Sequence, residues 1–472
     1  MIYNGGMVTR NNKFLPAETE RKLKDGLPIR LGLNKINELT RLIYEIRIAQ
    51  KKSFEEVMNE TGFSPKEENK GEIFNDLKKK LLSMRYPSIN AGKNPCEKIR
   101  IMPLKTGHKD EECAEWRGAL EPKRIFVEKK FLECDWTQEL ISRFPQAEVL
   151  KIDNIGEVRK AISAGDPTKE YNSRRENIIV TGNKASFIKP CPCTKDAKRC
   201  GYWILNLGFG CPFDCSYCYL QTYSNIPGII LNANIEDYYE AIKYFDGSVT
   251  GSKIRIGTGE FTDSLALEKY TGYAPKLIEF FRATKNLILE LKTKTSDIES
   301  VLKEKPHENV VLAWSINTPG IAEKYEKGAS FVKERIEAAF NAAKAGYQVA
   351  FHFDPLVWYE GWEKEYEGII EELFSYKEIR ANTLWISLGT LRYTPGLKQA
   401  AEERFNDNEI FYGGEFFLGF DGKFRYPEML RTSIYKKISG FIRDRGVSCW
   451  IYLCMEPKEM SAELSGLGYV AI

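Results

Sequence analysis

The second half of the chain alternates short apolar runs with longer amphipathic stretches. Short apolar runs rich in β-branched side chains predict strands, and apolar residues that recur with the helical period predict helices. Strands are predicted over 203–207, 253–256, 287–291, 310–315, 348–353 and 383–388. Helices are predicted over 235–244, 273–281, 296–302, 331–344 and 362–374. This order predicts an α/β fold whose parallel strands curl, through right-handed crossovers, toward a partial (β/α)6 TIM-type barrel.

The first part of the chain has a helical pattern instead. Apolar residues recur at helical spacing over 34–50, and we expect the side chain of Asn34 to cap this helix. The recurring residues are Ile36, Leu39, Ile43 and Ile46. A second amphipathic helix is predicted over 74–84. We expect these helices to form a structural extension rather than a dedicated binding arm.

Changes in composition divide the chain into four predicted parts. Pro, Asn and Gly gather over 86–95 and predict a linker, and short strands alternate with helices over 125–182. Asp421-Gly422 between aromatic-rich runs predicts a hairpin with a two-residue turn. The predicted parts are a helical N-terminal extension (1–95), an α/β N-terminal domain (96–195), the partial barrel (196–400) and a C-terminal hairpin and helix region (401–472).

Length, charge and cysteine content narrow the class of protein. The 472 residues exceed one ordinary domain, and 69 Lys and Arg against 66 Asp and Glu give a net charge that neither requires nor excludes a nucleic-acid partner. The sequence contains no apolar run of membrane-spanning length and no signal-peptide pattern at its start, so we expect a cytoplasmic protein with no membrane partner. In that compartment, 11 cysteines indicate metal or redox chemistry rather than disulfides.

The most specific chemical signal is a group of three cysteines after the first predicted strand. Cys211, Cys215 and Cys218 have C-x3-C-x2-C spacing. Three thiolates on one loop can hold three irons of a 4Fe-4S cluster and leave the fourth iron open to a small molecule. Zinc sites also use C-x2-C pairs, but no compact fourth ligand follows here. The spacing, with Tyr217 before the last cysteine, resembles the radical SAM superfamily.

That resemblance implies a 4Fe-4S cluster, S-adenosyl-L-methionine and an external one-electron donor of the flavodoxin or ferredoxin type. Barrel chemistry gathers at the carboxyl ends of the strands. The run 257–260 follows the second strand and resembles the Gly-Gly-Glu element that binds the methionine amino group, which selects Glu260. Lys292 and Lys294 follow the third strand, and we select Lys294 for the cofactor carboxylate.

Further polar residues follow the fourth and fifth strands. Ser315 and Asn317 offer a hydroxyl and an amide that can bind ribose oxygens. After the fifth strand, polar and aromatic residues over 352–362 predict the lining of a substrate pocket. His352 lies beside apolar strand residues, so a structural and a catalytic histidine are both open interpretations.

Together these stretches resemble the spore photoproduct lyase family from about residue 122 to the C-terminus. The matching stretches are 218–222, 293–294, 314–317, 345–347, 354–355 and 360–362. The resemblance implies a 5′-deoxyadenosyl radical that abstracts hydrogen from a thymine dimer and repairs it in DNA. It also implies that Tyr217 and Tyr219 act near the cofactor and in radical relay. A basic C-terminal hairpin near the damaged bases is implied as well, although the same hairpin can simply cover the open barrel.

One departure concerns the hydrogen donor. In the family, a cysteine near the end of the second strand returns a hydrogen atom to the product radical, and this position falls at or near Glu260. The segment 257–264 contains no cysteine. A carboxylate cannot replace a thiol in this step, so radical modification of a different substrate remains an alternative. A non-catalytic zinc or nucleic-acid-binding protein is a third.

A second cysteine group, Cys191, Cys193 and Cys200, precedes the first barrel strand. Three soft ligands so close together suit an auxiliary iron-sulfur cluster or zinc. One of them could instead be the hydrogen donor or a substrate-binding thiol, or all three could be structural. Ligands that could complete a metal site are Cys134, Cys113, Cys96 and His108. Near the C-terminus, Cys449 and Cys454 are predicted to be buried core thiols, with Cys454 a more distant donor candidate.

Overall fold

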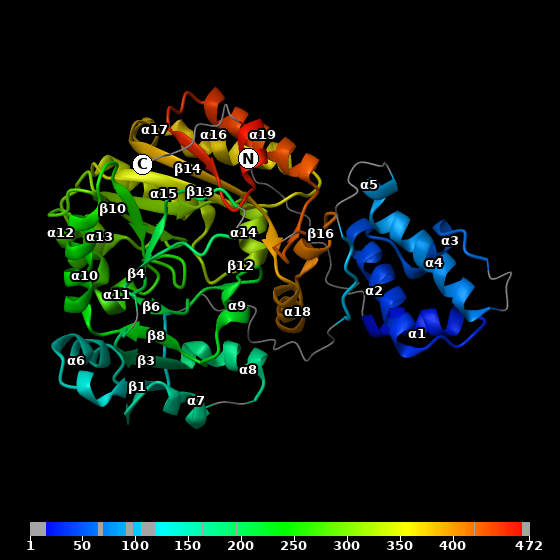
Figure 1. Cartoon of the computed structure of the whole chain (residues 1–472), viewed down its shortest axis with the longest axis horizontal. Coiled ribbons are helices and arrows are strands. Elements are labelled where there is room, and N and C mark those ends of the chain that lie inside the picture. Colours follow the sequence, from blue (N-terminus) through cyan, green and yellow to red (C-terminus); the bar gives the residue numbers. More distant parts are fainter. Residues whose placement is uncertain are drawn as a thin grey trace, which may run out of the picture. The chain divides into compact units, whose positions relative to one another are not determined.

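The computed structural model describes residues 16–64, 69–90, 98–104, 119–162, 165–184, 186–194, 197–419 and 421–464. These residues form two compact units. The described residues up to 104 and the segment 406–427 make the smaller unit, and those over 119–405 and 428–464 make the larger one (Figure 1). Cys96, Cys113 and His108, named above as ligands for a second metal, lie outside the described residues.

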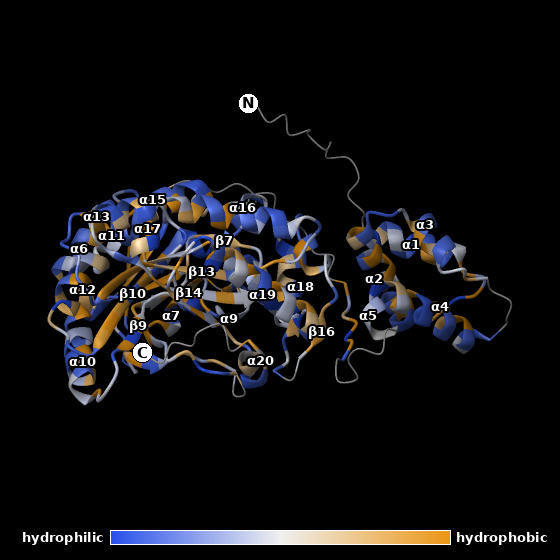
Figure 2. Cartoon of the chain, turned by 90° about the horizontal axis from the view of Figure 1, so that it is seen from above, coloured by the Kyte–Doolittle hydropathy of each residue, from blue (hydrophilic) through white to orange (hydrophobic). Residues whose placement is uncertain are grey.

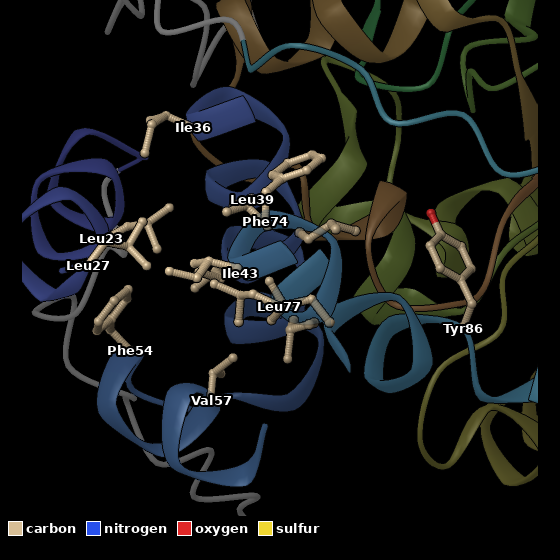
Figure 3. Close-up of a cluster of buried hydrophobic side chains, with 14 of the residues drawn as sticks. Leu23, Leu27, Ile36, Leu39, Ile43, Phe54, Val57, Phe74, Leu77 and Tyr86 are labelled. Atoms are coloured by element: carbon tan, nitrogen blue, oxygen red, sulfur yellow. The ribbon is translucent and has the colours of Figure 1, made fainter. Parts of the chain in front are cut away.

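The smaller unit is built on helices around one apolar core. Its helices are α1 (Pro16–Gly26), α2 (Leu33–Gln50), α3 (Phe54–Glu60), α4 (Lys70–Arg85) and α5 (Pro87–Asn90). Leu39, Ile43 and Leu77 are fully buried where α2 faces α4, and Figure 3 shows their side chains pointing toward one another. The predicted helical character of the N-terminal part is therefore confirmed.

The predicted cap of α2 is wrong. The helix begins at Leu33, so Gly32 holds the capping position and Asn34 lies inside the first turn. In α4 an asparagine does cap the helix, because the side chain of Asn69 accepts a hydrogen bond from the Gly71 N–H. This cap places the start of α4 four residues before the predicted range, at Lys70.

The hairpin of the smaller unit consists of β16 (Phe417–Leu418) and β17 (Phe424–Arg425), which pair antiparallel after the short helix η4 (Glu409–Phe411). The predicted hairpin is confirmed, but its turn is longer than two residues. The backbone of Gly419 donates to the carbonyl of Lys423 at 2.8 Å, and Gly422 takes a φ of 72°. Within the same unit, Arg85 donates to the carbonyl of Gly414 at 2.9 Å, which ties this segment to α4.

The larger unit contains an eight-stranded sheet in the order β18-β14-β13-β11-β10-β9-β5-β4. Its strands are β4 (Ile188–Pro190), β5 (Trp203–Leu205), β9 (Ile254–Gly257), β10 (Leu287–Thr293), β11 (Val310–Ser315), β13 (Gln348–Leu356), β14 (Thr383–Thr390) and β18 (Trp450–Leu453). Neighbouring strands are parallel except β4, which pairs antiparallel with β5. All six predicted strands form, and the predicted α/β class is confirmed as a curled half-barrel sheet. The sheet differs from the predicted six strands by gaining β4 and β18 at its edges.

Helices cover the outer face of this sheet (Figure 1). They are α10 (Ile235–Ser248), α12 (Tyr273–Phe281), α13 (Glu299–Leu302), α15 (Val332–Lys344), α16 (Trp362–Ser375), α17 (Lys377–Asn382) and α19 (Glu428–Asp444). The strands are mostly hydrophobic, and hydrophilic residues lie on the helices around them (Figure 2). Burial of apolar side chains between helices and sheet therefore fixes the strand ends on which the site is built.

A second, five-stranded sheet has the order β2-β1-β3-β8-β6. It contains β1 (Arg124–Glu128), β2 (Glu148–Ile152), β3 (Asn177–Thr181), β6 (Gly208–Phe209) and β8 (Ile229–Asn232). Its helices are α6 (Asp135–Ser142), α7 (Gly156–Ile162) and α8 (Pro167–Asn172), followed by η3 (Ser173–Glu176). The predicted α/β unit over 125–182 thus takes two more strands, β6 and β8, from either side of the cysteine loop.

The remaining elements of the larger unit are short. They are η2 (Lys129–Phe131), β7 (Asp214–Cys215), α9 (Leu220–Tyr223), α11 (Glu268–Thr271), α14 (Pro319–Tyr325), β12 (Glu326–Lys327), β15 (Arg392–Tyr393), α18 (Pro395–Arg404) and α20 (Lys458–Glu463). None of the described helices is both long and apolar enough to cross a bilayer.

Candidate active site

The loop of Cys211, Cys215 and Cys218 runs from β6 to α9 and is held by buried arginines. Arg174 donates to the backbone oxygens of Cys211 at 3.1 Å and Phe213 at 2.7 Å. The same guanidinium pairs with the carboxylate of Asp214 at 3.2 Å. Backbone carbonyls of an irregular loop need donors when they are buried, and Arg174 supplies them from η3.

Asp214 is the centre of a buried ion-pair cluster. Arg174, Arg175 and Arg404 approach its carboxylate at 3.2, 3.5 and 2.6 Å. Burial alone would raise the pKa of Asp214, but these arginines hold the pKa below its usual value, so the carboxylate stays charged. A charge buried this deeply is stable only while its partners remain. No local pattern in the sequence predicts this cluster, because Arg404 comes from α18, far along the chain.

Gln221 supports the same loop from α9. Its side-chain nitrogen donates to the backbone oxygens of Cys215 at 3.2 Å, Ser216 at 2.9 Å and Cys218 at 3.2 Å. Its side-chain oxygen accepts a hydrogen bond from Arg404. One amide therefore connects the loop backbone to the Asp214 cluster.

A two-stranded ribbon holds the other side of the loop. β7 pairs antiparallel with β12, so Cys215 faces Glu326. The hydroxyl of Tyr217 donates to the Glu326 carboxylate, which also pairs with Arg335 at 2.6 Å. Lys294 lies 5.9 Å from the centre of the Tyr217 ring. Burial would lower the pKa of Lys294, but Glu326 and Cys215 raise it, so the ammonium stays charged beside the cysteine loop.

The three thiols of the loop are soft donors suited to iron. Burial raises the pKa of all three, Cys218 also raises that of Cys211, and Cys218 and Cys211 both raise that of Cys215, so the three thiols are near one another. Lys294 and Arg174 act in the opposite direction on the Cys218 thiol and favour its thiolate. In the part of the chain that the structure describes, no three His, Cys, Asp or Glu side chains are gathered as a ready-made site for a single metal ion. The donor type and the supported backbone fit a cluster bound by this loop.

Glu260 follows β9 at the carboxyl end of the sheet. Its carboxylate pairs with Lys292 of β10 at 3.3 Å, and its side chain is 22% exposed. The hydroxyl of Tyr219 donates to the Glu260 backbone oxygen, which connects the cysteine loop to this strand end. Gly257 is required here, because a Cβ at that position would lie 2.0 Å from the Tyr202 hydroxyl oxygen.

Ser315 and Asn317 lie at the end of β11. Ser315 faces His352 in the register between β11 and β13, and its backbone oxygen accepts from Arg335 at 3.0 Å. The side-chain oxygen of Asn317 accepts from the Tyr366 hydroxyl at 2.6 Å and from the Thr318 N–H at 3.0 Å. Its side-chain nitrogen donates to the Pro355 carbonyl at 3.1 Å. Protein partners thus occupy most of the hydrogen-bonding capacity of this amide.

His352 lies inside the curled sheet. Its Nε2 is 2.8 Å from the Glu290 carboxylate of β10. Burial lowers the pKa of the His352 ring, so the imidazole is neutral at neutral pH. Trp385 donates to the same carboxylate at 2.9 Å, and Arg255 lies 3.8 Å from it. Of the two interpretations left open by the sequence, these contacts favour a structural histidine.

A third group of charges lies at the ends of β13 and β14. Arg392 forms a bidentate ion pair with Asp354, and both N–O distances are 2.9 Å. It also approaches the sulfur of Cys454, just after β18, at 3.4 Å. The prediction that Cys449 and Cys454 are fully buried core residues is wrong, because both residues are only half-buried. Cys454 instead faces polar residues at a strand end.

The second cysteine group lies at the same end of the sheet as Glu260. Among the influences on the pKa of Cys191, Cys193 and Cys454, the Glu260 carboxylate acts upward in each case, so all three thiols are near that carboxylate. Cys200 has a different hydrogen-bond partner, since its sulfur accepts from Arg255 at 3.3 Å. Among the described residues, the cysteines of this group also do not come together as ligands for a single metal ion. Nothing in the described structure supports an auxiliary cluster or zinc there.

The family model and the relatives that match this chain in sequence share one description. The family model described as spore photoproduct lyase matches residues 120–412. Spore photoproduct lyase from Clostridium acetobutylicum is 26% identical over 253 residues, which are 53% of this chain and 73% of that protein. Spore photoproduct lyase from a Geobacillus species is 26% identical over 294 residues, which are 61% of this chain and 84% of that protein.

Solved structures show the same fold. Spore photoproduct lyase complexed with dinucleoside spore photoproduct has a TM-score of 0.62 and 21% identity, covering 71% of this chain and all of that one (100%). A double mutant of spore photoproduct lyase with bound AdoMet and dinucleoside spore photoproduct has the same TM-score, 0.62, and the same coverage, 71% and 100%, at 21% identity.

These matches support neither a non-catalytic zinc or nucleic-acid-binding protein nor radical modification of an unrelated substrate. The family model covers more than half of the chain, and it includes the cysteine loop and the strand ends described above. The chain therefore belongs to the spore photoproduct lyase family of the radical SAM superfamily.

Proposed function

We propose that this protein binds a 4Fe-4S cluster and S-adenosyl-L-methionine and repairs the spore photoproduct, a thymine lesion, in DNA. The observation that carries the proposal is the loop of Cys211, Cys215 and Cys218. Buried side chains and a short β-ribbon support its backbone, and the chain belongs to this family. A solved relative holds both AdoMet and a dinucleoside spore photoproduct. When bound, such a cluster supplies the electron for the reductive cleavage of S-adenosyl-L-methionine.

The three cysteine thiolates hold the cluster in this proposal, and nearby residues bind the methionine end of the cofactor. Glu260 accepts hydrogen bonds from the ammonium group, since its carboxylate is partly exposed at the strand end. Lys294 binds the carboxylate group, because its charged ammonium lies on the cysteine-loop side of the sheet. Lys292 serves a different purpose, since it already neutralises Glu260.

Ser315 and Asn317 complete the proposed cofactor site at the ribose. The amide nitrogen of Asn317 has two N–H groups and gives one to the Pro355 carbonyl at 3.1 Å. The second N–H can therefore donate to a ribose oxygen while the contacts of the side-chain oxygen orient the amide.

Two tyrosines connect the cysteine loop with the strand ends. The Tyr219 hydroxyl donates a hydrogen bond to the backbone oxygen of Glu260, and the Tyr217 hydroxyl donates one to the Glu326 carboxylate. In this proposal Tyr219 takes part in radical relay and Tyr217 shapes the cofactor side of the loop. Cys191 and Cys454 are the candidate hydrogen donors, because Glu260 acts on the pKa of both thiols and a thiol readily gives its hydrogen atom to a carbon radical.

The first test measures cleavage of the cofactor. The purified chain is reconstituted with iron and sulfide under anaerobic conditions, reduced with dithionite in place of the cellular electron donor, and given S-adenosyl-L-methionine. We expect 5′-deoxyadenosine from the wild-type protein and none above background from a variant with Cys211, Cys215 and Cys218 replaced by alanine. Equal amounts from both proteins would overturn the proposal.

The second test measures repair. Dinucleoside spore photoproduct is added to the same reaction, and thymidylyl-thymidine is the expected product. Single variants Cys191→Ala and Cys454→Ala should keep 5′-deoxyadenosine formation, and the one that removes the donor should lose thymidylyl-thymidine. Cofactor cleavage without repair by the wild-type protein would reject spore photoproduct as the substrate and leave the cofactor assignment standing.

A further inference from the structure

Cys191 and Cys193 are held together in a tight turn. The Cys193 N–H donates to the Cys191 carbonyl at 2.7 Å across Pro192, whose ring restricts its backbone. The Cys191 N–H donates to the Tyr202 carbonyl at 3.0 Å and extends the pairing of β4 with β5. On the other side, the Lys198 backbone N–H donates to the Glu456 carbonyl at 2.9 Å. The backbone on both sides of the two thiols is thus held, at Tyr202 before β5 and at Glu456 after β18.

The turn places the two side chains beside each other, and a hydrogen bond between the Cys191 and Cys193 thiols is the largest influence on the pKa of both. In a fully extended chain alternate Cα atoms are about 7 Å apart, and the turn brings these two closer. A Cα separation somewhat below 7 Å lies within the range of about 4.4–6.8 Å that is found across disulfides. A bond between the two sulfurs therefore needs little movement of the backbone.

The charges around the pair differ for the two thiols. The hydrogen bond from Cys191, with Arg199 and Arg392, outweighs burial and Glu260 and lowers the pKa of Cys193 to about 7. The pKa of Cys191 is raised, first because its proton is shared with Cys193, then by burial and Glu260. Both side chains are partly exposed. At neutral pH the pair thus combines a reactive thiolate with an adjacent thiol.

We propose that Cys191 and Cys193 form a redox-active dithiol that exchanges with small-molecule disulfides. The Cys193 thiolate attacks one sulfur of the disulfide, forms a mixed disulfide and releases the first thiolate. Cys191 gives its proton to that thiolate and attacks the Cys193 sulfur. This closes the Cys191–Cys193 disulfide and releases the second thiolate. Two electrons pass from the protein pair to the small disulfide, so the exchange is balanced and reversible.

This inference does not rest on the proposed function, because the exchange needs neither iron nor S-adenosyl-L-methionine. It assigns two members of the second cysteine group, Cys191 and Cys193, to thiol–disulfide exchange rather than to metal binding. Oxidation would remove the thiolate beside Glu260 and Arg392 and so change the charge at this end of the sheet.

The test uses the full chain in glutathione buffers of increasing oxidised fraction, followed by acid quenching, alkylation and peptide mass spectrometry. In the wild-type protein we expect the peptide carrying Cys191 and Cys193 to lose two hydrogen atoms and to escape alkylation. Cys191→Ser should instead accumulate glutathione on Cys193, because the resolving thiol is missing. Cys193→Ser should accumulate little glutathione on Cys191.

Cys449 is the internal control, because burial raises its pKa to about 12. At pH 7 we expect Cys193 to be alkylated at least about tenfold faster than Cys449. Arg199→Gln should shift the pH at which alkylation is half-maximal upward, whereas Arg159→Gln, another exposed arginine, should not. Equal alkylation rates for Cys193 and Cys449, no disulfide in the most oxidising buffer, or bound zinc that blocks alkylation would each overturn the proposal.

Discussion

Glu290 is the residue on which the polar interior of the curled sheet depends. Its carboxylate contacts His352 at 2.8 Å and Trp385 at 2.9 Å and lies 3.8 Å from Arg255. Arg255 is also surrounded by aromatic rings, with Tyr452 4.8 Å from its guanidinium carbon. A buried arginine of this kind needs one negative partner, and Glu290 is that partner.

Replacing Glu290 by glutamine should destabilise the fold strongly. The substitution keeps the shape of the side chain but leaves Arg255 buried without its counter-charge, a change that costs about 3–5 kcal/mol in other buried pairs. Glu299→Gln is the matched control, because the Glu299–Lys303 pair is 81% and 70% exposed and such pairs contribute about 1 kcal/mol or less. Chemical denaturation of both variants measures the difference. Similar losses in the two proteins would contradict a central role for Glu290.

The same carboxylate predicts a loss of stability in acid. Burial opposes its charge, but Arg255 and His352 hold the pKa of Glu290 at about 2, below its ordinary value of 4.5. Its contribution is therefore complete above about pH 4.5 and is lost as the pH falls toward about 2, amounting to about 3 kcal/mol. His352 adds a loss that begins below its ordinary pKa of 6.5, because burial lowers the folded-state pKa. Denaturation from pH 7 to 3 should show a steeper decline for the wild-type protein than for Glu290→Gln.

At the scale of elements, the cysteine loop has almost no regular structure of its own and relies on its neighbours. β7 supplies two residues of it, and η3, α9 and β12 supply the groups that hold its backbone. Among these supports, Gln221 is an uncharged side chain whose nitrogen donates three hydrogen bonds to loop carbonyls. Its loss should loosen the loop without removing a buried ion pair.

We therefore predict that Gln221→Met reduces retention of iron by the reconstituted protein severalfold and lowers the melting temperature modestly, because the Asp214 ion pairs remain. The methionine fills the same space but cannot donate to the loop carbonyls. Thr222→Val is the control, since the Thr222 hydroxyl also bonds to a nearby carbonyl, that of Tyr219 at 3.0 Å, but is exposed to solvent. Iron content after gel filtration is the measurement. Equal retention by wild type and Gln221→Met would show that the amide does not support the loop.

The elements also show what the sequence can predict. Long apolar runs located the six central strands, because a strand buried on both faces has few polar residues. The edge strand β18 escaped prediction, since four residues, Trp450–Leu453, beside two cysteines also fit simple packing. The Asp214 cluster escaped for another reason: Arg404 and Asp214 lie 190 positions apart and meet only in the fold. The glycine before α2 took the capping position that Asn34 was expected to hold.

At the scale of the whole molecule, the smaller unit is discontinuous in sequence. The segment 406–427 packs with the N-terminal helices, although the sequence grouped it with the C-terminal region. Tyr412 packs edge-on against Tyr44 of α2 at 5.8 Å, and Phe417 packs against Tyr86 at 5.4 Å. The family match begins at residue 120 and ends at 412, within this segment, so this family does not account for the helices that cover these rings.

Removal of residues 1–108 should therefore leave a chain with exposed aromatic rings rather than an isolated catalytic part. Tyr412 and Phe417 are almost fully buried in the intact protein and would lose Tyr44 and Tyr86 as partners. We expect the truncated chain to bind more of a hydrophobic fluorescent dye and to aggregate at lower concentration than the intact one. Replacing both rings by serine in the truncated chain should reverse these effects, because it removes the exposed apolar surface. Unchanged dye binding after truncation would mean that segment 406–427 does not depend on the N-terminal helices for its burial.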